Sequence, residues 1–189
     1  FIIDNASTDN TIKEYEHRKR ENYQLIPNEN NLGVAAGNNQ GIKKALSDDC
    51  DFILLINNDT IFEEKLLQKL LDAHQKYGSS IITPKMMYYD SNNVIWYAGG
   101  FFDRKKAWLN YHRGQNEVDR GQFQQNDVIE YAPTCCALIH RAVFDHIGFM
   151  DEKYFVYFDD TDFFYRVVKN GKHEARYIND VQFYHKIGS

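Results

Sequence analysis

The residues best suited to chemistry are three carboxylates close together, Asp159, Asp160 and Asp162. Capping a helix needs one carboxylate, most simply Asp159, and three of them repel one another unless a cation or a shared proton offsets their charge. Aromatic residues on both sides, from Tyr154 to Tyr165, would desolvate the group and raise a carboxyl pKa towards that of a general base. The segment predicts a catalytic base at the start of a helix, with simple capping as the alternative.

A second acidic residue, Asp59, lies in the polar segment Asn57-Asn58-Asp59-Thr60 that follows an apolar run. A carboxylate there can bind Mg²⁺ or Mn²⁺, which usually take phosphate and water as further ligands. His185 is a candidate second ligand, since neutral imidazole binds Mn²⁺ and softer metals. Each residue also suits a simpler role, Asp59 in a turn and His185 at the surface.

Two further polar segments are candidate binding loops. Asp4 and Asn5 end the short apolar run 1–3, where Asp4 can accept a hydrogen bond from a base or a ribose hydroxyl. Residues 30–41 are rich in glycine and asparagine, a composition that lets the backbone approach a ligand and points N–H groups at anions. The spacing is neither that of dinucleotide folds nor that of P-loops, so the ligand stays open.

Alternating strands and helices are expected to position these residues. Apolar runs predict strands at 1–3, 24–26, 52–56 and 80–83, and periodic segments predict helices at about 8–20, 35–46, 61–77, 142–147 and 159–169. Thr60 and Glu63 have the spacing of a capping box for the third helix. The pattern predicts an α/β fold, a mostly parallel sheet flanked by helices with ligands at the carboxyl ends of its strands, followed by an irregular β and loop region.

Composition excludes several classes of protein. The chain has 189 residues and a net charge of −5, which suits one domain and makes nucleic-acid binding a poor hypothesis. The longest apolar run, Phe52 to Ile56, is far below the roughly 20 residues that span a bilayer, so no transmembrane segment is expected. Three cysteines without C-x-x-C spacing favour a reduced, cytoplasmic setting.

Taken together, these segments resemble glycosyltransferase family 2, the inverting GT-A-type nucleotide-sugar transferases, and are nearest its rhamnosyltransferase-like branch. The resemblance lies in residues 3–9 (D-N-x-S-x-D), 31–41 (N-x-G-x-x-x-G-x-N-x-G), 57–59 (D-x-D or N-x-D), 137–151, 158–162 (E-D-x-D) and 184–185. Asn57 replaces the first Asp of the metal motif, and Asp159 replaces the usual Glu. The family's first strand would precede residue 1, so the sequence is expected to be an N-terminally truncated piece.

The resemblance implies a single glycosyltransferase catalytic domain over 1–189, with a nucleotide-binding half at 1–84 and an acceptor and catalytic half at 85–189. It implies metal-assisted, inverting transfer of a hexosyl or rhamnosyl group from a nucleotide diphosphate-sugar to a glycan or lipid-linked glycan hydroxyl. The setting implied is surface polysaccharide biosynthesis in the cytoplasm, with the parent protein at the inner face of the cell membrane by peripheral association. A non-catalytic nucleotide- or glycan-binding module derived from such an enzyme, and a nucleotidyltransferase, are the alternatives.

The resemblance also assigns residues. Asp160 is the implied general base, and Asp59 with His185 the implied ligands of a divalent cation, Mg²⁺ or Mn²⁺. The implied nucleotide-sugar contacts are Asp4, Asn5, Asn31, Gly33, Gly37, Asn38, Asn58 and Asp59, and the implied acceptor-side residues are Asp159, Asp162 and Trp96. Aromatic residues that suit either sugar rings or the core are Tyr88, Tyr89, Trp96 and Tyr97.

Overall fold

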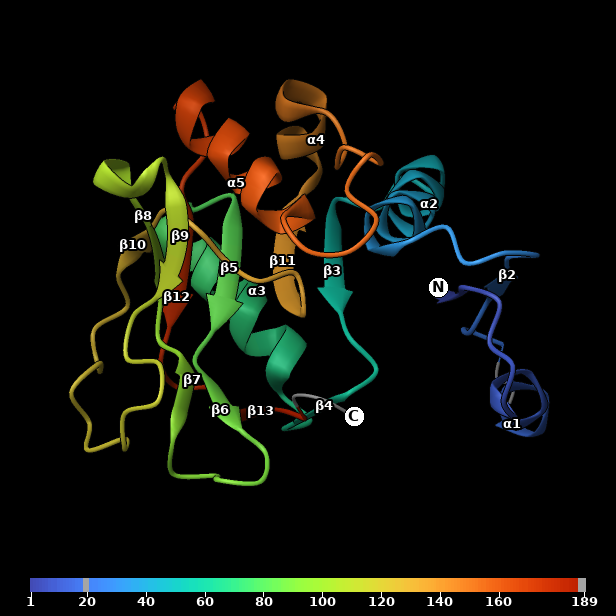
Figure 1. The fold of residues 1–189 in the computed structure, drawn as a ribbon, viewed down its shortest axis with the longest axis horizontal. Helices are drawn as coiled ribbons and strands as arrows, with labels where there is room; N and C mark the ends of the chain where they lie inside the picture. Colours follow the sequence, from blue (N-terminus) through green and yellow to red (C-terminus); the bar gives the residue numbers. More distant parts are fainter. Residues whose placement is uncertain (19–20, 187–189) are drawn as a thin grey trace.

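The computed structural model of the protein describes residues 1–18 and 21–186. Its centre is a five-stranded sheet in the order β10 (Val128–Ile129), β12 (Ala175–Ile178), β5 (Ile81–Pro84), β11 (Cys136–His140) and β3 (Phe52–Ile56), drawn in Figure 1. β12 and β5 pair in parallel, whereas the other neighbours are antiparallel. The α/β class is confirmed, and the central sheet is mixed rather than mostly parallel because β11, from the second half of the chain, inserts between β3 and β5.

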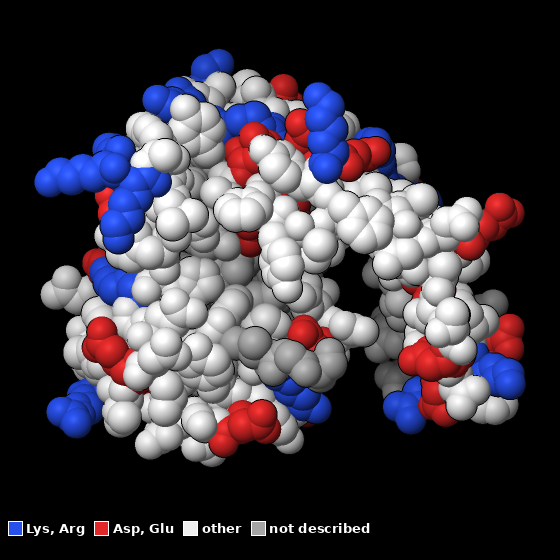
Figure 2. Space-filling view, viewed as in Figure 1, with Lys and Arg blue, Asp and Glu red and all other residues white. Residues whose placement is uncertain are grey.

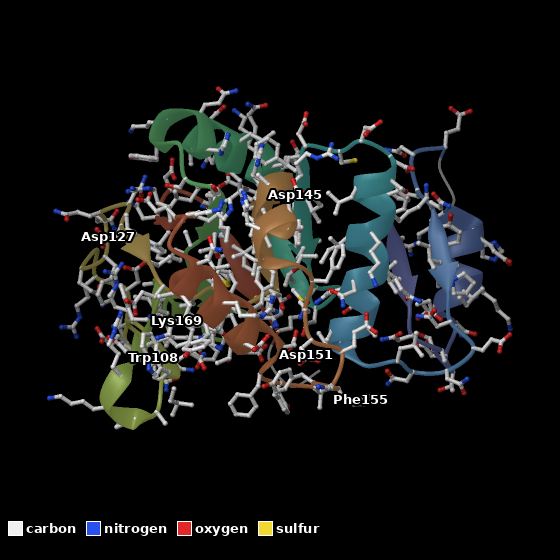
Figure 3. All side chains as sticks on the ribbon, turned by 90° about the horizontal axis from the view of Figure 1, so that it is seen from above. Trp108, Asp127, Asp145, Asp151, Phe155 and Lys169 are labelled. Atoms are coloured by element: carbon white, nitrogen blue, oxygen red, sulfur yellow. The ribbon has the colours of Figure 1, made fainter. Side chains whose placement is uncertain are left out.

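Helices cover both faces of this sheet. They are α2 (Val34–Ser47), α3 (Leu66–Tyr77), α4 (Arg141–Ile147) and α5 (Asp159–Asn170). α3 and α5 lie on opposite sides of the sheet (Figures 1 and 3). The core between them is apolar: Leu70 of α3, Ile81 of β5 and Phe163 of α5 are each fully buried. None of the helices in the described part of the chain is long and apolar enough to cross a membrane.

A separate parallel pair, β1 (Ile2–Asp4) and β2 (Leu25–Pro27), forms the amino-terminal part together with α1 (Thr11–Arg18). α2 packs against both β1 and β3. Among the described residues β1 pairs only with β2, and β3 only with β11. A cavity of about 690 Å³ lies at this junction, lined by residues that include Ile2, Tyr15 and Asn58. Figure 2 shows the opening between α1 and the body of the molecule.

A second sheet, of four strands, corrects one prediction. Its order is β4 (Thr60–Phe62), β13 (Phe183–His185), β6 (Met86–Tyr88) and β7 (Ile95–Tyr97). The predicted capping box is wrong, because Thr60 belongs to β4 and the helix begins at Leu66. The Glu63 carboxylate instead accepts hydrogen bonds from Lys69 Nζ (2.9 Å) and from the backbone N–H of Gln182 (2.8 Å). Local spacing could not indicate that β13 pairs with this segment.

The start of α5 also differs from the prediction. Phe158, in a left-handed conformation with φ of 65°, is the N-cap residue, and Asp159 is the first residue inside the helix. The predicted cap at Asp159 is therefore wrong, and its carboxylate is left for other contacts. The helix ends as expected, with Gly171 in a left-handed conformation. Between β7 and β10 in the chain lies the hairpin of β8 (Gly100–Asp103) and β9 (Leu109–His112), joined by a 3-10 turn at Arg104–Lys106.

Candidate active site

The predicted metal ligands meet because β13 pairs with β4. In that register His185 lies opposite Thr60, and Thr60 is the residue that follows Asp59. His185 Nε2 is 3.2 Å from Asp59 Oδ2, and the Lys186 N–H donates to the Asp59 carbonyl at 2.8 Å. The structure thus brings Asp59 and His185 together, although they are far apart in the sequence. Trp96 of β7 lies with its ring centroid 4.5 Å from that of His185 and supports the imidazole.

The donor atoms of this pair fit a divalent cation. Asp59 Oδ1 and His185 Nδ1 are buried, and neither has a hydrogen-bond partner in the described part of the chain. A buried polar atom without a partner is costly, and a ligand or cation would relieve that cost at Asp59. Within residues 1–18 and 21–186 no group of three or more His, Cys, Asp or Glu side chains could hold a metal ion. A cation here would therefore take further ligands from phosphate and water, as Mg²⁺ commonly does.

Asp160, the predicted base, lies in the first turn of α5 and is held by Tyr131 and by the backbone and hydroxyl of Thr161. Its Oδ2 accepts a hydrogen bond from Tyr131 Oη at 2.7 Å, and its Oδ1 accepts one from the Thr161 N–H at 2.7 Å. Burial raises the pKa of Asp160, while these donors act in the opposite direction. The result is a desolvated carboxylate in a fixed orientation, which is the arrangement a general base needs.

Asp159 lies beside it and is 4% exposed. Burial, followed by the charge of Asp160, raises the pKa of Asp159 to about 6. Its Oδ2 is buried and has no hydrogen-bond partner among the described residues. Burial and the neighbouring charge therefore favour the protonated form of Asp159 in mildly acidic solution.

Asp59 and Asp160 both lie near one buried thiol. Burial raises the pKa of Cys135 strongly, and the adjacent Cys136 and the charges of Asp59 and Asp160 raise it further. The Cys135 carbonyl also accepts a hydrogen bond from the Asn57 N–H at 3.1 Å, so the segment that carries Asp59 runs beside Cys135. The structure therefore brings the predicted base and the predicted metal pair to the same end of β3 and β11.

The residues of the predicted nucleotide side shape one another. Asn5 Nδ2 donates to the Gly33 carbonyl at 3.0 Å, and the Gly33 N–H donates to Asn31 Oδ1 at 2.9 Å. A Cβ on Gly37 would lie 3.2 Å from Asn5 Nδ2, so the glycine allows α2 to approach β1 closely. Asp4 is buried, and its Oδ2 accepts a hydrogen bond from the Ser7 N–H at 3.1 Å. These residues fix the shape of the loop, and their direct contact with a nucleotide stays a prediction.

The glycine loop also touches the segment that leads into α5. The Val34 N–H donates to the Phe155 carbonyl at 2.8 Å, and a Cβ on Gly33 would lie 2.5 Å from that oxygen. Figure 3 shows Phe155 in the loop beside the first turn of α2. One residue that the sequence did not single out, Asn39, is buried and pairs with both backbone groups of Met150, accepting at 3.0 Å and donating at 2.9 Å. The sequence feature that could have indicated Asn39 is its position inside the predicted helix, where a polar side chain is unusual on a buried face.

The remaining predicted residues are placed as follows. Asn38 Nδ2 lies 3.7 Å from the sulfur of Met150, and Asn58 is exposed at the cavity beside β1. Asp162 pairs with Arg166 at 2.8 Å within α5, which gives it a structural partner. Trp96 lies beside the metal pair, so a role towards an acceptor there stays a prediction.

Of the four aromatic residues proposed for sugar rings, Tyr97 is fully buried and belongs to the core. Its hydroxyl donates to the Tyr131 carbonyl at 2.7 Å. Two site residues, Tyr131 and His112, were not found from the sequence, because region 85–135 lacks a periodic pattern. The His112 ring stacks on that of Tyr131 with centroids 5.7 Å apart, and burial lowers the pKa of His112 to about 4.

The family follows from a comparison with known sequences. The family model "Glycosyl transferase family 2" matches residues 1–148, which is most of the chain. The chain belongs to glycosyltransferase family 2. Its relatives include the low-salt glycan biosynthesis hexosyltransferase Agl10 of Haloferax volcanii, 24% identical over 87% of this chain and 52% of that protein. The N-acetylglucosaminyl-diphospho-decaprenol L-rhamnosyltransferase of Mycobacterium tuberculosis is 26% identical over 90% of this chain and 61% of that protein.

The fold of this family 2 chain is also that of GT-A glycosyltransferases. The crystal structure of GalNAc-T7 with UDP, GalNAc and Mn²⁺ superimposes with a TM-score of 0.72 at 14% identity, over 97% of this chain and 37% of that one. At that identity the likeness concerns the fold. The chain spans between about half and three fifths of the relatives it matches. Both relatives are named as transferases of sugars, one a hexosyltransferase and the other a rhamnosyltransferase.

Proposed function

We propose that the protein transfers a sugar from a nucleotide diphosphate-sugar to a hydroxyl group with inversion at the anomeric carbon, and that Asp160 is the general base. The observation that carries this proposal is the position of Asp160, a buried carboxylate held by Tyr131 and Thr161 near the thiol that also lies near Asp59. A single displacement needs one base on the acceptor hydroxyl and assistance to the leaving diphosphate, and these two sites would supply both.

Asp59 and His185 would hold the divalent cation. When bound there it would offset charge on the diphosphate, which is worth several kcal/mol in transition-state stabilisation. The nucleoside pocket would be shaped by the hydrogen-bonded residues Asp4, Asn5 and Gly33. The GalNAc-T7 structure, which has the same fold, contains Mn²⁺ and UDP, and this supports the proposed arrangement.

Asp160 would remove the proton from the acceptor hydroxyl as its oxygen attacks the anomeric carbon. A carboxylate has about four lone-pair positions, and three of those on Asp160 are used by the Tyr131 hydroxyl, the Thr161 N–H and the Thr161 hydroxyl (3.3 Å). The remaining position can accept the hydroxyl proton. A base placed in this way typically contributes about 10²–10⁴-fold to the rate.

The acceptor we propose is a lipid-linked glycan in surface polysaccharide biosynthesis, in the cytoplasm at the inner face of the membrane. The support is that the mycobacterial relative is named for a decaprenol-linked substrate.

The test is a transfer assay on the Asp160→Asn variant of the whole protein. UDP-, GDP- and dTDP-sugars would be supplied with Mn²⁺ and N-acetylglucosaminyl-diphospho-polyprenol, and release of the nucleoside diphosphate would be measured. We expect Asp160→Asn to lose about 10²–10⁴-fold in kcat and to keep its nucleotide affinity. The matched control is Asp145→Asn, an exposed carboxylate on α4 (Figure 3), which should transfer normally. Wild-type turnover by Asp160→Asn would refute the base assignment.

A further inference from the structure

One buried hydroxyl contacts the proposed base, and nothing in the sequence indicated it. Tyr131 is 3% exposed, and its Oη lies 2.7 Å from Asp160 Oδ2. It does not belong to α5; it follows β10 and forms an isolated bridge with Gly100. The contact therefore joins the irregular second half of the chain to the first turn of α5.

The Tyr131 ring packs against neighbouring aromatic rings. It stacks with His112 (centroids 5.7 Å apart) and meets Phe164 edge-on (5.8 Å). Its carbonyl accepts a hydrogen bond from Tyr97 Oη, and a Cβ on Gly100 would lie 2.5 Å from the same oxygen. Side chains packed this tightly keep one rotamer, so the hydroxyl reaches Asp160 from a fixed point.

The hydroxyl can act only as a donor towards Asp160. Burial raises the pKa of Tyr131 strongly and the charge of Asp160 raises it further, so the phenol stays neutral and keeps its proton. The other titratable groups around Asp160 are Asp159 on the same helix and the Cys135 thiol before β11. Neither offers a hydrogen bond to the carboxylate in the structure, whereas Tyr131 does.

We propose that Tyr131 is a positioning residue for Asp160: its hydroxyl fixes one carboxylate oxygen, so that the free lone pair faces the acceptor. The proposal rests on the function proposed above, because it assigns Tyr131 to the base of that reaction. Loss of the hydrogen bond removes a donor that favours the ionised form, so the pKa of Asp160 should rise. It also frees the carboxylate to rotate, which lowers kcat without weakening donor binding.

The test compares Tyr131→Phe with Tyr177→Phe. Tyr177 is also buried, but its hydroxyl donates to the Phe123 carbonyl, so its removal controls for loss of a buried hydrogen bond. Carboxyl ¹³C NMR would follow the titration of Asp160, identified by the signal missing from Asp160→Asn, in the metal-free chain. We expect the Asp160 pKa to rise by about 1 in Tyr131→Phe and to stay at the wild-type value in Tyr177→Phe.

The transfer assay supplies the second readout. Tyr131→Phe should show about a tenfold lower kcat, an unchanged KM for the donor, and a pH–rate profile whose acidic limb moves up with the Asp160 pKa. An Asp160 pKa identical in Tyr131→Phe and wild type would overturn the proposal. A normal rate for Asp160→Asn would instead overturn the proposed function, and the NMR titration would still report the contact, so the two failures are distinguishable.

Discussion

The stability of the protein should depend on pH through two buried groups that act in opposite directions. Burial lowers the pKa of His112 from its ordinary 6.5 to about 4, an effect that the nearby His185 strengthens. Burial and the charge of Asp160 raise the pKa of Asp159 from 3.8 to about 6. Each difference corresponds to about 3 kcal/mol of folding free energy.

The signs follow from which state binds the proton. Above pH 6.5 His112 is neutral in both states; as the pH falls towards 4, the unfolded chain takes up a proton that the folded chain refuses, and stability is lost. Asp159 behaves oppositely: as the pH rises from 3.8 to 6, the unfolded chain releases a proton that the folded chain keeps, and stability is again lost. In the wild type the two effects nearly cancel between pH 4 and 6.5.

Single variants separate the two effects. His112→Phe keeps a ring against Trp96 and Tyr131 and removes the His112 titration, together with the contact between His112 Nδ1 and the Trp96 carbonyl (3.2 Å). The unfolding free energy of this variant should fall by about 3 kcal/mol as the pH rises from 4 to 6.5. Asp159→Asn should gain about 3 kcal/mol over the same range. Urea unfolding at a series of pH values in EDTA measures both, with the exposed His17→Gln as control. Parallel pH curves for both variants and wild type would refute the burial argument.

Three further substitutions test how the site is held together. Gly33→Ala should cost more than about 3 kcal/mol in urea unfolding, since φ of 85° and ψ of 173° suit only glycine and the new Cβ would meet Phe155. The control Gly78→Ala, at a left-handed position with no atom near the new Cβ, should cost about 1 kcal/mol. Equal costs for the two variants would disprove the contact with Phe155. Asn39→Ala should lower the free energy of unfolding by about 3 kcal/mol, because both backbone groups of Met150 lose their partner. The control Asn38→Ala should change it by no more than about 0.5 kcal/mol. Equal losses in the two variants would count against the role of Asn39 in holding Met150. Measured by calorimetry, Asp59→Ala should bind UDP with the same affinity with and without Mn²⁺, whereas the UDP affinity of the wild type should rise at least about tenfold with the metal. A metal-dependent rise in UDP affinity that the variant keeps would contradict the ligand role of Asp59.

The elements with local signals were predictable from the sequence. The strand Phe52–Ile56 was predicted with the bounds observed, and the helix ends at Gly78 and Gly171 follow from glycine in a left-handed conformation. Asp59 was singled out because it lies in the polar segment that follows this strand, and Asp160 because three carboxylates at the start of one helix exceed what a cap needs.

The errors and omissions have a common cause, which is pairing between distant segments. Thr60 has the spacing of a capping box, yet β13 converts its segment into a strand. β11 enters the sheet antiparallel, which no local pattern indicates. Tyr131 acquires its role only when its loop packs against α5. Such contacts are energetically favourable only in the folded chain, so propensity and periodicity carry no trace of them.

The most direct test of the site is the effect of bound Mn²⁺ on individual carboxyl groups. Paramagnetic Mn²⁺ broadens the ¹³C signals of nearby nuclei, so a titration of the whole protein with Mn²⁺ and UDP reports which aspartates surround the metal. The account predicts that the Asp59 and Asp160 signals broaden together while that of Asp145 on α4 stays sharp. A sharp Asp160 signal beside a broadened Asp59 signal would contradict the claim that both serve one active site.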